Sequence, residues 1–239
     1  ATPQSAMPVV QGNVTEAVFL PLPETKEGTV AEEALGALLE KAADADAAAI
    51  GPGMTTEAET QTLVRSFADN TPKPFVLDAD GLNAFAGRST ALAERKAPAV
   101  LTPHLGEFAR LSGLGPEEIA AGRIAAVREL ARATNAAVLL KGSRTVIASP
   151  GGPARVNPTG TSSLATAGSG DVLTGMTAGF TARGLDPFDA AAVAAYLHGL
   201  AGSIAGASKG EGATARDVVA AVPHAVRRAQ PGAATEAEA

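Results

Sequence analysis

Residues 167–175 read AGSGDVLTG and pass from a glycine-rich loop directly into a predicted helix. They follow NPTG at residues 157–160, a second run of small and turn-forming residues. Small residues allow several backbone N–H groups to point toward one spot, and the start of a helix adds about half a positive charge there. The pattern therefore predicts an anion-binding site at the beginning of this helix.

Asp171 lies at the mouth of the predicted anion site. An acidic residue there can accept the proton of an attacking hydroxyl group, while the amides stabilise charge on a phosphoryl group in transfer. Aspartate is also a common helix cap. The helix start favours the ionised carboxylate, which predicts a weak base, although phosphoryl transfer depends more on positioning than on basicity. Catalysis and capping both remain open for Asp171 at this point.

The rest of the chain alternates short apolar runs with longer Ala-rich segments of helical period. This alternation is typical of an α/β fold with a mainly parallel sheet and crossover helices. The predicted strands are 17–20, 47–50, 75–77, 99–101, 137–140 and 145–148. The predicted helices are 30–43, 56–67, 116–133, 171–182, 187–206 and 215–228.

An antiparallel meander is predicted at one edge of the sheet. Turn-forming residues 141–144 separate two strands, and PGGP at 150–153 precedes a further strand at 154–156. Such an edge often carries a ligand. Residues 1–229 are expected to form a single domain, and 230–239 a disordered tail. Because the chain opens without Met and residues 8–10 already look like the interior of a fold, we expect an upstream segment to precede it.

Composition narrows the class of protein. Of the 239 residues 46% are hydrophobic but only 3% are aromatic, so the core must consist of Ala, Val, Leu and Ile. The absence of Cys excludes disulfide scaffolds, thiolate catalysis and Cys-ligated zinc. The net charge of −6 argues against nucleic acid or an anionic membrane as a partner. No segment reads as a membrane span or signal peptide. We expect a cytoplasmic protein with a small-molecule substrate.

Further motifs occur in a characteristic order. They are GPG at 51–53, LDADGLN at 77–83, LTPHLGE at 101–107, LKGSRT at 140–145, the 157–175 segment and YLHG at 196–199. With these motifs the chain resembles the ribokinase-like superfamily, and specifically its ADP/ATP-dependent NAD(P)H-hydrate dehydratases, from about residue 9 to residue 228. The resemblance implies a ribokinase-like fold and a repair lyase, which dehydrates hydrated NADH or NADPH to the working coenzyme at the expense of ADP or ATP.

The substrate site is expected where loops follow strands, because ligands bind at the carboxyl ends of strands in open α/β sheets. The predicted substrate-binding residues are Gly53, Asp78, Asn83, His104 and Asp171. Asp80 is a further candidate for substrate hydroxyls or a hydrated Mg²⁺. The resemblance places Glu107 near a Mg²⁺ ion, which it could bind through water. The structural alternatives are a tight turn for 51–53, Asx-turns and capping for 78–83, and simple solvation for His104 and Glu107.

The nucleotide site is expected at the meander turn and the glycine-rich loop. The predicted residues are Lys141, Gly142, Ser143, Arg144, Thr145, Gly168, Ser169 and Gly170. By resemblance, the Lys-Gly-x-x-Thr motif contacts the AMP part of the nucleotide with Gly170 beside it, and Asp171 is the catalytic residue. The alternative is a hairpin turn with a solvated lysine. His198 lies on an Ala-rich helical face and is interpreted as structural.

Departures from the family pattern keep alternatives open. Family members usually begin with an extra strand and a glycine-rich segment that helps to form the substrate site, and nothing before Ala1 supplies it. Thr161 and Thr166 stand where some relatives carry Asn and Lys. One alternative is a kinase of the same superfamily for a vitamin-precursor alcohol of the hydroxymethylpyrimidine, thiazole or pyridoxal type. Another is a non-catalytic nucleotide-binding or scaffold chain. Because relatives often form symmetric tetramers, the resemblance implies a homo-oligomer.

Overall fold

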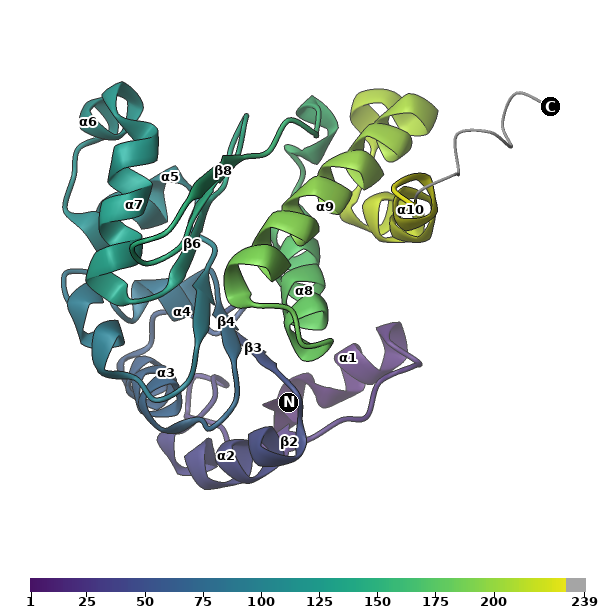
Figure 1. Ribbon diagram of the computed structural model, residues 1–239. Helices are drawn as coiled ribbons and strands as arrows, with labels where there is room; N and C mark the ends of the chain where they lie inside the picture. Colours follow the sequence, from purple (N-terminus) through teal and green to yellow (C-terminus); the bar gives the residue numbers. More distant parts are fainter. Residues whose placement is uncertain (231–239) are drawn as a thin grey trace.

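The structure is a computed structural model that describes residues 1–230, and its centre is a six-stranded sheet (Figure 1). The strands follow the order β3 (Ala48–Ile50), β4 (Phe75–Leu77), β5 (Ala99–Leu101), β6 (Ala137–Leu140), β7 (Val146–Ala148) and β8 (Ala154–Val156). The first four are parallel, whereas β7 and β8 continue the sheet in antiparallel pairs. The predicted mainly parallel sheet with an antiparallel edge is confirmed.

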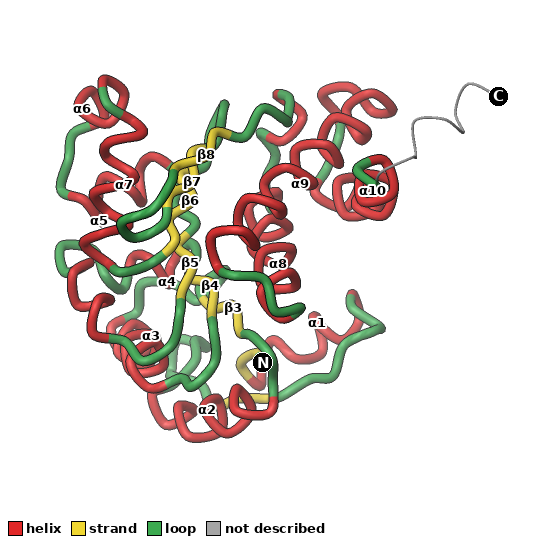
Figure 2. The backbone as a smooth tube through the Cα atoms, viewed as in Figure 1, coloured by secondary structure: helices red, strands yellow, loops and turns green. Residues whose placement is uncertain are grey.

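Helices cover both faces of the sheet (Figure 2). One face packs against α3 (Ala58–Asn70), α5 (Leu105–Ser112) and α7 (Arg123–Thr134). The other packs against α8 (Ser169–Ala182) and α9 (Pro187–Lys209). Successive strand residues serve opposite faces, so that Phe75 and Leu77 contact the first layer and Val76 the second. Burial on both faces explains why the strands read as continuous apolar runs.

The remaining helices lie around this core. They are α1 (Met7–Asn13), α2 (Leu35–Asp44), α4 (Asp80–Asn83), α6 (Pro116–Ala121) and α10 (Ala215–Arg228). α10 has the bounds predicted from the sequence and packs against α9 through small apolar side chains. The short helices α1, α4 and α5 were not predicted, because one or two turns show too little periodicity to be recognised.

Two predictions near the N-terminus were wrong. Residues 17–20 form no strand, and Val18 is 94% exposed. The strand in this region is β2 (Pro21–Leu22), which pairs in parallel with β1 (Thr2–Pro3). Residues 8–10 do not lie in the interior either, since they belong to α1, a helix with no buried residue. An apolar run alone therefore did not indicate burial here.

Two predicted helices are divided into two elements each in the structure. Segment 30–43 becomes a 3-10 turn, Glu32–Ala34, followed by α2 from Leu35. Segment 116–133 divides into α6 and α7 at Gly122, whose φ of −138° and ψ of 44° are not helical. Glycine interrupts a helix readily because fixing its flexible backbone in the helical conformation costs more conformational entropy than for other residues. This break places Arg123 at the start of α7, where its side chain is used in the site described below.

α9 is long and apolar enough to cross a membrane by length and composition, within the stretch Pro187–Gly212. A buried core helix passes the same test, and 56% of the apolar window lies buried inside the fold. Its buried residues are mostly small, which lets the helix approach the sheet, α8 and α10 closely. The tail predicted for residues 230–239 falls, apart from Gln230, outside the described residues.

The topology brings distant motifs to one edge of the sheet. The parallel strands β3 to β6 all end at the same edge, and Gly51, Asp78 and Lys141 directly follow three of them. The first turns of α8 meet this edge, because Thr174 of α8 donates a hydrogen bond to Asp78. Open α/β sheets bind their ligands at this edge.

Candidate active site

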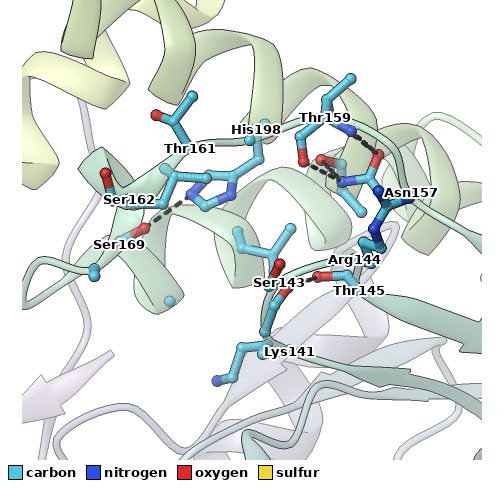
Figure 3. A pocket seen from close by; sticks show the side chains of 18 of the residues that line it. Lys141, Ser143, Arg144, Thr145, Asn157, Thr159, Thr161, Ser162, Ser169 and His198 are labelled. Carbon is cyan, nitrogen blue, oxygen red and sulfur yellow. Dashed lines mark hydrogen bonds between the residues drawn. The ribbon is translucent and has the colours of Figure 1, made fainter. Parts of the chain in front are cut away.

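A cavity of about 660 Å³ opens beside the first turn of α8 (Figure 3). Its walls come from four segments that lie far apart in the sequence: the turn after β6, the loop after β8, the start of α8 and the middle of α9. All five residues of the predicted nucleotide turn, 141–145, line it, as do Ser169 and Gly170. The structure thus brings the meander turn and the glycine-rich loop to one cavity.

Gly168 begins the first turn of α8. It adopts a left-handed conformation with a φ of +82° and occupies the N-cap position, with no side-chain cap. Asp171 is the third residue of the helix, and within residues 1–230 its carboxylate accepts no hydrogen bond. Asp171 therefore does not cap α8. Within residues 1–230 no side chain caps the first turn, although the Ser169 N–H donates to the Thr166 carbonyl at 3.3 Å.

The pKa of the Asp171 carboxyl is raised above its ordinary value. Partial burial is the main cause, the negative charge of Asp78 adds to it, and the positive charge of Lys141 opposes it. This pKa shift runs in the direction opposite to the one expected from the helix start alone. A raised pKa makes the carboxylate a better proton acceptor near neutral pH.

The side chain of Asp78, a predicted substrate-binding residue, is almost completely buried. It is 1% exposed, and both carboxylate oxygens are engaged. Oδ1 accepts a hydrogen bond from Lys141 Nζ at 2.7 Å, and Oδ2 accepts one from Thr174 Oγ1 at 2.5 Å. Thr174 was not singled out from the sequence, and only its spacing of one helical turn from Asp171 could have indicated it.

His104 and Glu107 form a capping box at the start of α5. His104 Nδ1 accepts from the backbone N–H of Gly106 at 2.9 Å, while Glu107 Oε2 accepts from the backbone N–H of His104 at 2.8 Å. Glu107 is 6% exposed, and its Oε1 lies 3.2 Å from His104 Nε2. Both residues thus have a local structural task, and their predicted contacts with substrate and metal stay predictions.

The residues at this edge do not fit a metal ion bound directly by the protein. No group of three or more metal-ligating side chains occurs among the residues that the structure describes. Lys141 Nζ already lies between the two buried carboxylates, 2.7 Å from Asp78 and 3.9 Å from Glu107. Mg²⁺ usually keeps several waters and binds with substrate phosphates, so any ion here would arrive with a nucleotide.

The loops after β3 and β4 are joined by side-chain hydrogen bonds. Asp80 accepts from the backbone N–H of Thr55 at 2.9 Å and from Asn83 Nδ2 at 3.1 Å, and Asn83 in turn accepts from Arg110 Nε at 3.0 Å. Gly53 is exposed, with a φ of +72°. Asn83 and Gly53 thus border the same edge of the sheet as Asp78.

Arg123 holds the 141–145 turn and was not predicted as a site residue. Its guanidinium donates to the carbonyl oxygens of Leu140, Lys141 and Ser143 at 3.3, 3.1 and 3.4 Å. Gly142 has a φ of +145°, and a Cβ there would lie 2.8 Å from Arg123 Nη2. The backbone conformation therefore favours glycine at this position, and a side chain there would also displace the Arg123 guanidinium. No local pattern could have indicated a contact between α7 and this turn.

The middle of α9 forms the back wall of the cavity (Figure 3). Asn157 Nδ2 donates to the Ala195 carbonyl at 3.0 Å, and Thr159 Oγ1 donates to the Tyr196 carbonyl at 2.8 Å. A Cβ at Gly199 would lie 2.0 Å from Thr159 Oγ1, so the loop requires glycine there. The YLHG motif thus seats the loop that follows β8.

His198 also belongs to this wall. It is buried, lines the cavity and hydrogen-bonds Ser169 Oγ through Nε2 at 3.2 Å. Burial lowers the pKa of His198 to about 4, although the backbone hydrogen bond with Ser169 raises it slightly. The ring is therefore neutral at neutral pH. The interpretation of His198 as structural is consistent with this contact, because the ring hydrogen-bonds Ser169, the first residue of α8.

This buried histidine predicts a pH dependence of stability. The unfolded chain binds a proton at His198 near pH 6.5, whereas the folded chain resists protonation until about pH 4. The free energy of unfolding should therefore fall as the pH drops through this interval, by at most about 3 kcal/mol. Denaturant titrations at several pH values should show a flatter profile for His198→Gln. His224→Gln, at an exposed position, should keep the wild-type profile; equal profiles for all three proteins would contradict the assignment.

Residues 2–224 match the family model described as NAD(P)H-hydrate dehydratase. The chain belongs to the NAD(P)H-hydrate dehydratase family. This family member is 43% identical, over 95% of its length, to the bifunctional NAD(P)H-hydrate repair enzymes of Moorella thermoacetica and of Thermofilum pendens. It spans 43% and 44% of the lengths of these two curated relatives.

Solved structures of related proteins agree with the family assignment. The ADP/ATP-dependent NAD(P)H-hydrate dehydratase of Bacillus subtilis, co-crystallised with ATP/Mg²⁺, is 32% identical with a TM-score of 0.74, over 95% of this chain and 77% of that one. A ribokinase-like protein of Enterococcus faecalis has a TM-score of 0.68 at 27% identity, over 84% of this chain and 70% of that one. The fold of this dehydratase-family chain is therefore ribokinase-like, as predicted.

A solved kinase structure is also similar in fold to this chain. The hydroxyethylthiazole kinase of Pyrococcus horikoshii has a TM-score of 0.65 at 23% identity, over 82% of this chain and 79% of that one. At this identity the likeness establishes the shared fold alone. The family model that matches residues 2–224 is described as NAD(P)H-hydrate dehydratase.

Proposed function

We propose that this chain is a nucleotide-dependent dehydratase that returns hydrated NADH or NADPH to the working coenzyme, with Asp171 as its catalytic residue. The observation that carries the proposal is the position of Asp171 in the first turn of α8, where its carboxylate does not cap the helix. The adjoining cavity is lined by the 141–145 turn, Ser169 and Gly170. Family membership supports the choice of reaction.

The proposed reaction uses the cavity for ADP or ATP. The 141–145 turn binds the AMP half, and the loop Gly168 to Gly170 at the start of α8, of which Ser169 and Gly170 line the cavity, binds the phosphates. Asp171 accepts the proton of the hydroxyl on the hydrated ring as that oxygen bonds to the terminal phosphorus and the shortened nucleotide leaves. The ring nitrogen's lone pair then expels phosphate, and loss of a proton from the neighbouring ring carbon restores the double bond. Phosphate leaves more easily than hydroxide, which is why a nucleotide is consumed.

The substrate is proposed to lie along the carboxyl edge of the sheet, between Gly53, Asn83 and His104. Mg²⁺, when bound with the nucleotide, neutralises phosphate charge, and Glu107 is the proposed contact through water. A cytoplasmic location and a homo-oligomeric state stay predictions.

A direct assay tests the proposed function. The chain is incubated with hydrated NADH or NADPH and either ADP or ATP, while the absorbance of the reduced nicotinamide and the release of phosphate are followed. We expect one phosphate for each coenzyme restored. Nucleotide consumption with a hydroxymethylpyrimidine, thiazole or pyridoxal alcohol, without recovery of the nicotinamide band, would instead identify the kinase alternative. Absence of turnover with any of these substrates would favour a non-catalytic chain.

Changes in the nucleotide turn should act on binding more than on chemistry. Thr145 Oγ1 donates to the Gly142 carbonyl at 3.1 Å, and Arg123 donates to two carbonyls of the same turn and to that of Leu140 just before it. Loss of one such hydrogen bond is worth about 1 kcal/mol, so Thr145→Val and Arg123→Met should each raise the nucleotide KM about fivefold or more, with a smaller effect on kcat. Arg128→Met, at an exposed position of α7, should change neither constant. An unchanged KM in both turn variants would remove the turn from the nucleotide site.

A further inference from the structure

A buried ion pair joins three elements at the carboxyl edge of the sheet. Asp78 follows β4, Lys141 follows β6, and Thr174 lies on α8. The side chain of Asp78 is 1% exposed and that of Lys141 is 19% exposed. Burial of a charge is unfavourable unless it is paired and hydrogen-bonded, and within residues 1–230 Asp78 meets this condition through Lys141 and Thr174.

The Lys141 ammonium lies at the start of α8 and not beside the rest of its turn. A Cβ built on Gly170 would be 3.4 Å from Lys141 Nζ. Figure 3 shows the lysine side chain extending away from Ser143 and Thr145. The positive end of a helix disfavours a cation, and the negative charges that offset this are Asp78, hydrogen-bonded at 2.7 Å, and Glu107, at 3.9 Å. Asp78 thus holds a positive charge where phosphate oxygens would converge.

We propose that Lys141 binds the phosphate end of the nucleotide, at the phosphoryl group that reacts, and that Asp78 and Thr174 are the positioning residues that hold it there. This narrows the contact proposed above for the whole 141–145 turn, because the AMP half is then left to Ser143, Arg144 and Thr145. One ammonium hydrogen is used by Asp78, which leaves two for phosphate oxygens. A lysine at this position stabilises the charge that develops during phosphoryl transfer, together with the amides of α8. This inference rests on the proposed function only in that the cavity takes an adenine nucleotide.

Binding of AMP, ADP and ATP to Lys141→Met tests whether Lys141 contacts the phosphate end of the nucleotide or its AMP half. Calorimetric titration should show Kd for ADP and ATP raised about tenfold or more, because a charge-assisted hydrogen bond is lost. Kd for AMP should change by less than about threefold, since the AMP half does not depend on the ammonium. Lys96→Met removes the same charge at an exposed position and should leave all three constants unchanged. Equal weakening of AMP and ADP, or unchanged ADP binding, would overturn the proposal.

Lys141→Met leaves the buried Asp78 carboxylate unpaired and is expected to lower the thermal midpoint. The double variant Lys141→Met/Asp78→Asn removes both charges and should recover most of that loss while keeping the weak ADP binding. Thr174→Val keeps Lys141 but removes one anchor of Asp78, so its ADP affinity should lie between those of the wild type and Lys141→Met. Wild-type ADP affinity in the double variant would refute the role of Lys141.

The same titrations distinguish this inference from the proposed function. If Lys141→Met shows the AMP-versus-ADP contrast but the wild-type chain does not restore hydrated NADH, the dehydratase proposal is contradicted and the assignment of Lys141 is supported. If the wild-type chain restores hydrated NADH but Lys141→Met binds AMP and ADP with equally reduced affinity, the dehydratase proposal is supported and the assignment of Lys141 is contradicted. A wild-type chain that binds none of the three nucleotides overturns both.

Discussion

Asp171→Asn should lower kcat for hydrate repair by at least roughly 10²-fold, since general-base assistance contributes about 10²–10⁴-fold. Asparagine keeps the size of the side chain but cannot accept the proton of the substrate hydroxyl. Nucleotide Kd should stay within a few-fold or fall, because the change removes a negative charge from beside the phosphates. The thermal midpoint should persist, since the Asp171 carboxylate accepts no hydrogen bond within residues 1–230. The measurements are kcat, nucleotide Kd and thermal unfolding on one variant.

α10 supplies a matched control for this change. Asp217 is also the third residue of its helix, but its carboxylate accepts from the Thr214 backbone N–H at 2.9 Å and from Thr214 Oγ1 at 2.7 Å. Asp217→Asn should therefore leave kcat unchanged. The pH profile gives a second readout: wild-type kcat should fall as the pH drops through the raised pKa of Asp171. A variant Asp171→Asn that repairs the hydrate at near wild-type rate would defeat the mechanism.

Gly51→Ala should destabilise the fold by about 4 kcal/mol or more, enough to prevent folding in a domain of ordinary stability. Gly51 has a φ of +130°, which an L side chain rarely adopts. A Cβ there would also lie 1.8 Å from the backbone carbonyl oxygen of Asp78 and 2.7 Å from the backbone nitrogen of Gly81. Because the clash is with backbone atoms, no side-chain rotation can relieve it. Soluble yield and the midpoint of denaturant unfolding measure the effect.

The control for Gly51 is a glycine with free space around it. Gly36 lies in α2, and a Cβ there meets nothing within 4 Å. Gly36→Ala should stabilise the helix by about 0.5–1 kcal/mol, because alanine has the higher helix propensity. Wild-type stability of Gly51→Ala would contradict the close approach of Gly51 to the Asp78 carbonyl.

The sequence predicted those parts of the fold that depend on local patterns. Apolar runs bounded by turn residues located β3 to β8, and helical periodicity located α8, α9 and α10. It failed where an apolar run had no partner, as at Val18, and where a single Gly122 divided a helix. The motifs also indicated which residues would gather at the carboxyl edge, because parallel strands end at one edge.

Only the tertiary structure decided what the charged side chains do there. Asp78 pairs with Lys141 across 63 positions of sequence and with Thr174 across 96, and no periodicity links such residues. Partial burial and the negative charge of Asp78 raise the pKa of Asp171, while the positive charge of Lys141 opposes this shift. His104 and Glu107 likewise hydrogen-bond within the capping box at the start of α5. Local sequence thus determined which elements form and where the site lies. Pairing, burial and charge balance arise from contacts between distant segments, so they were settled only when the chain folded.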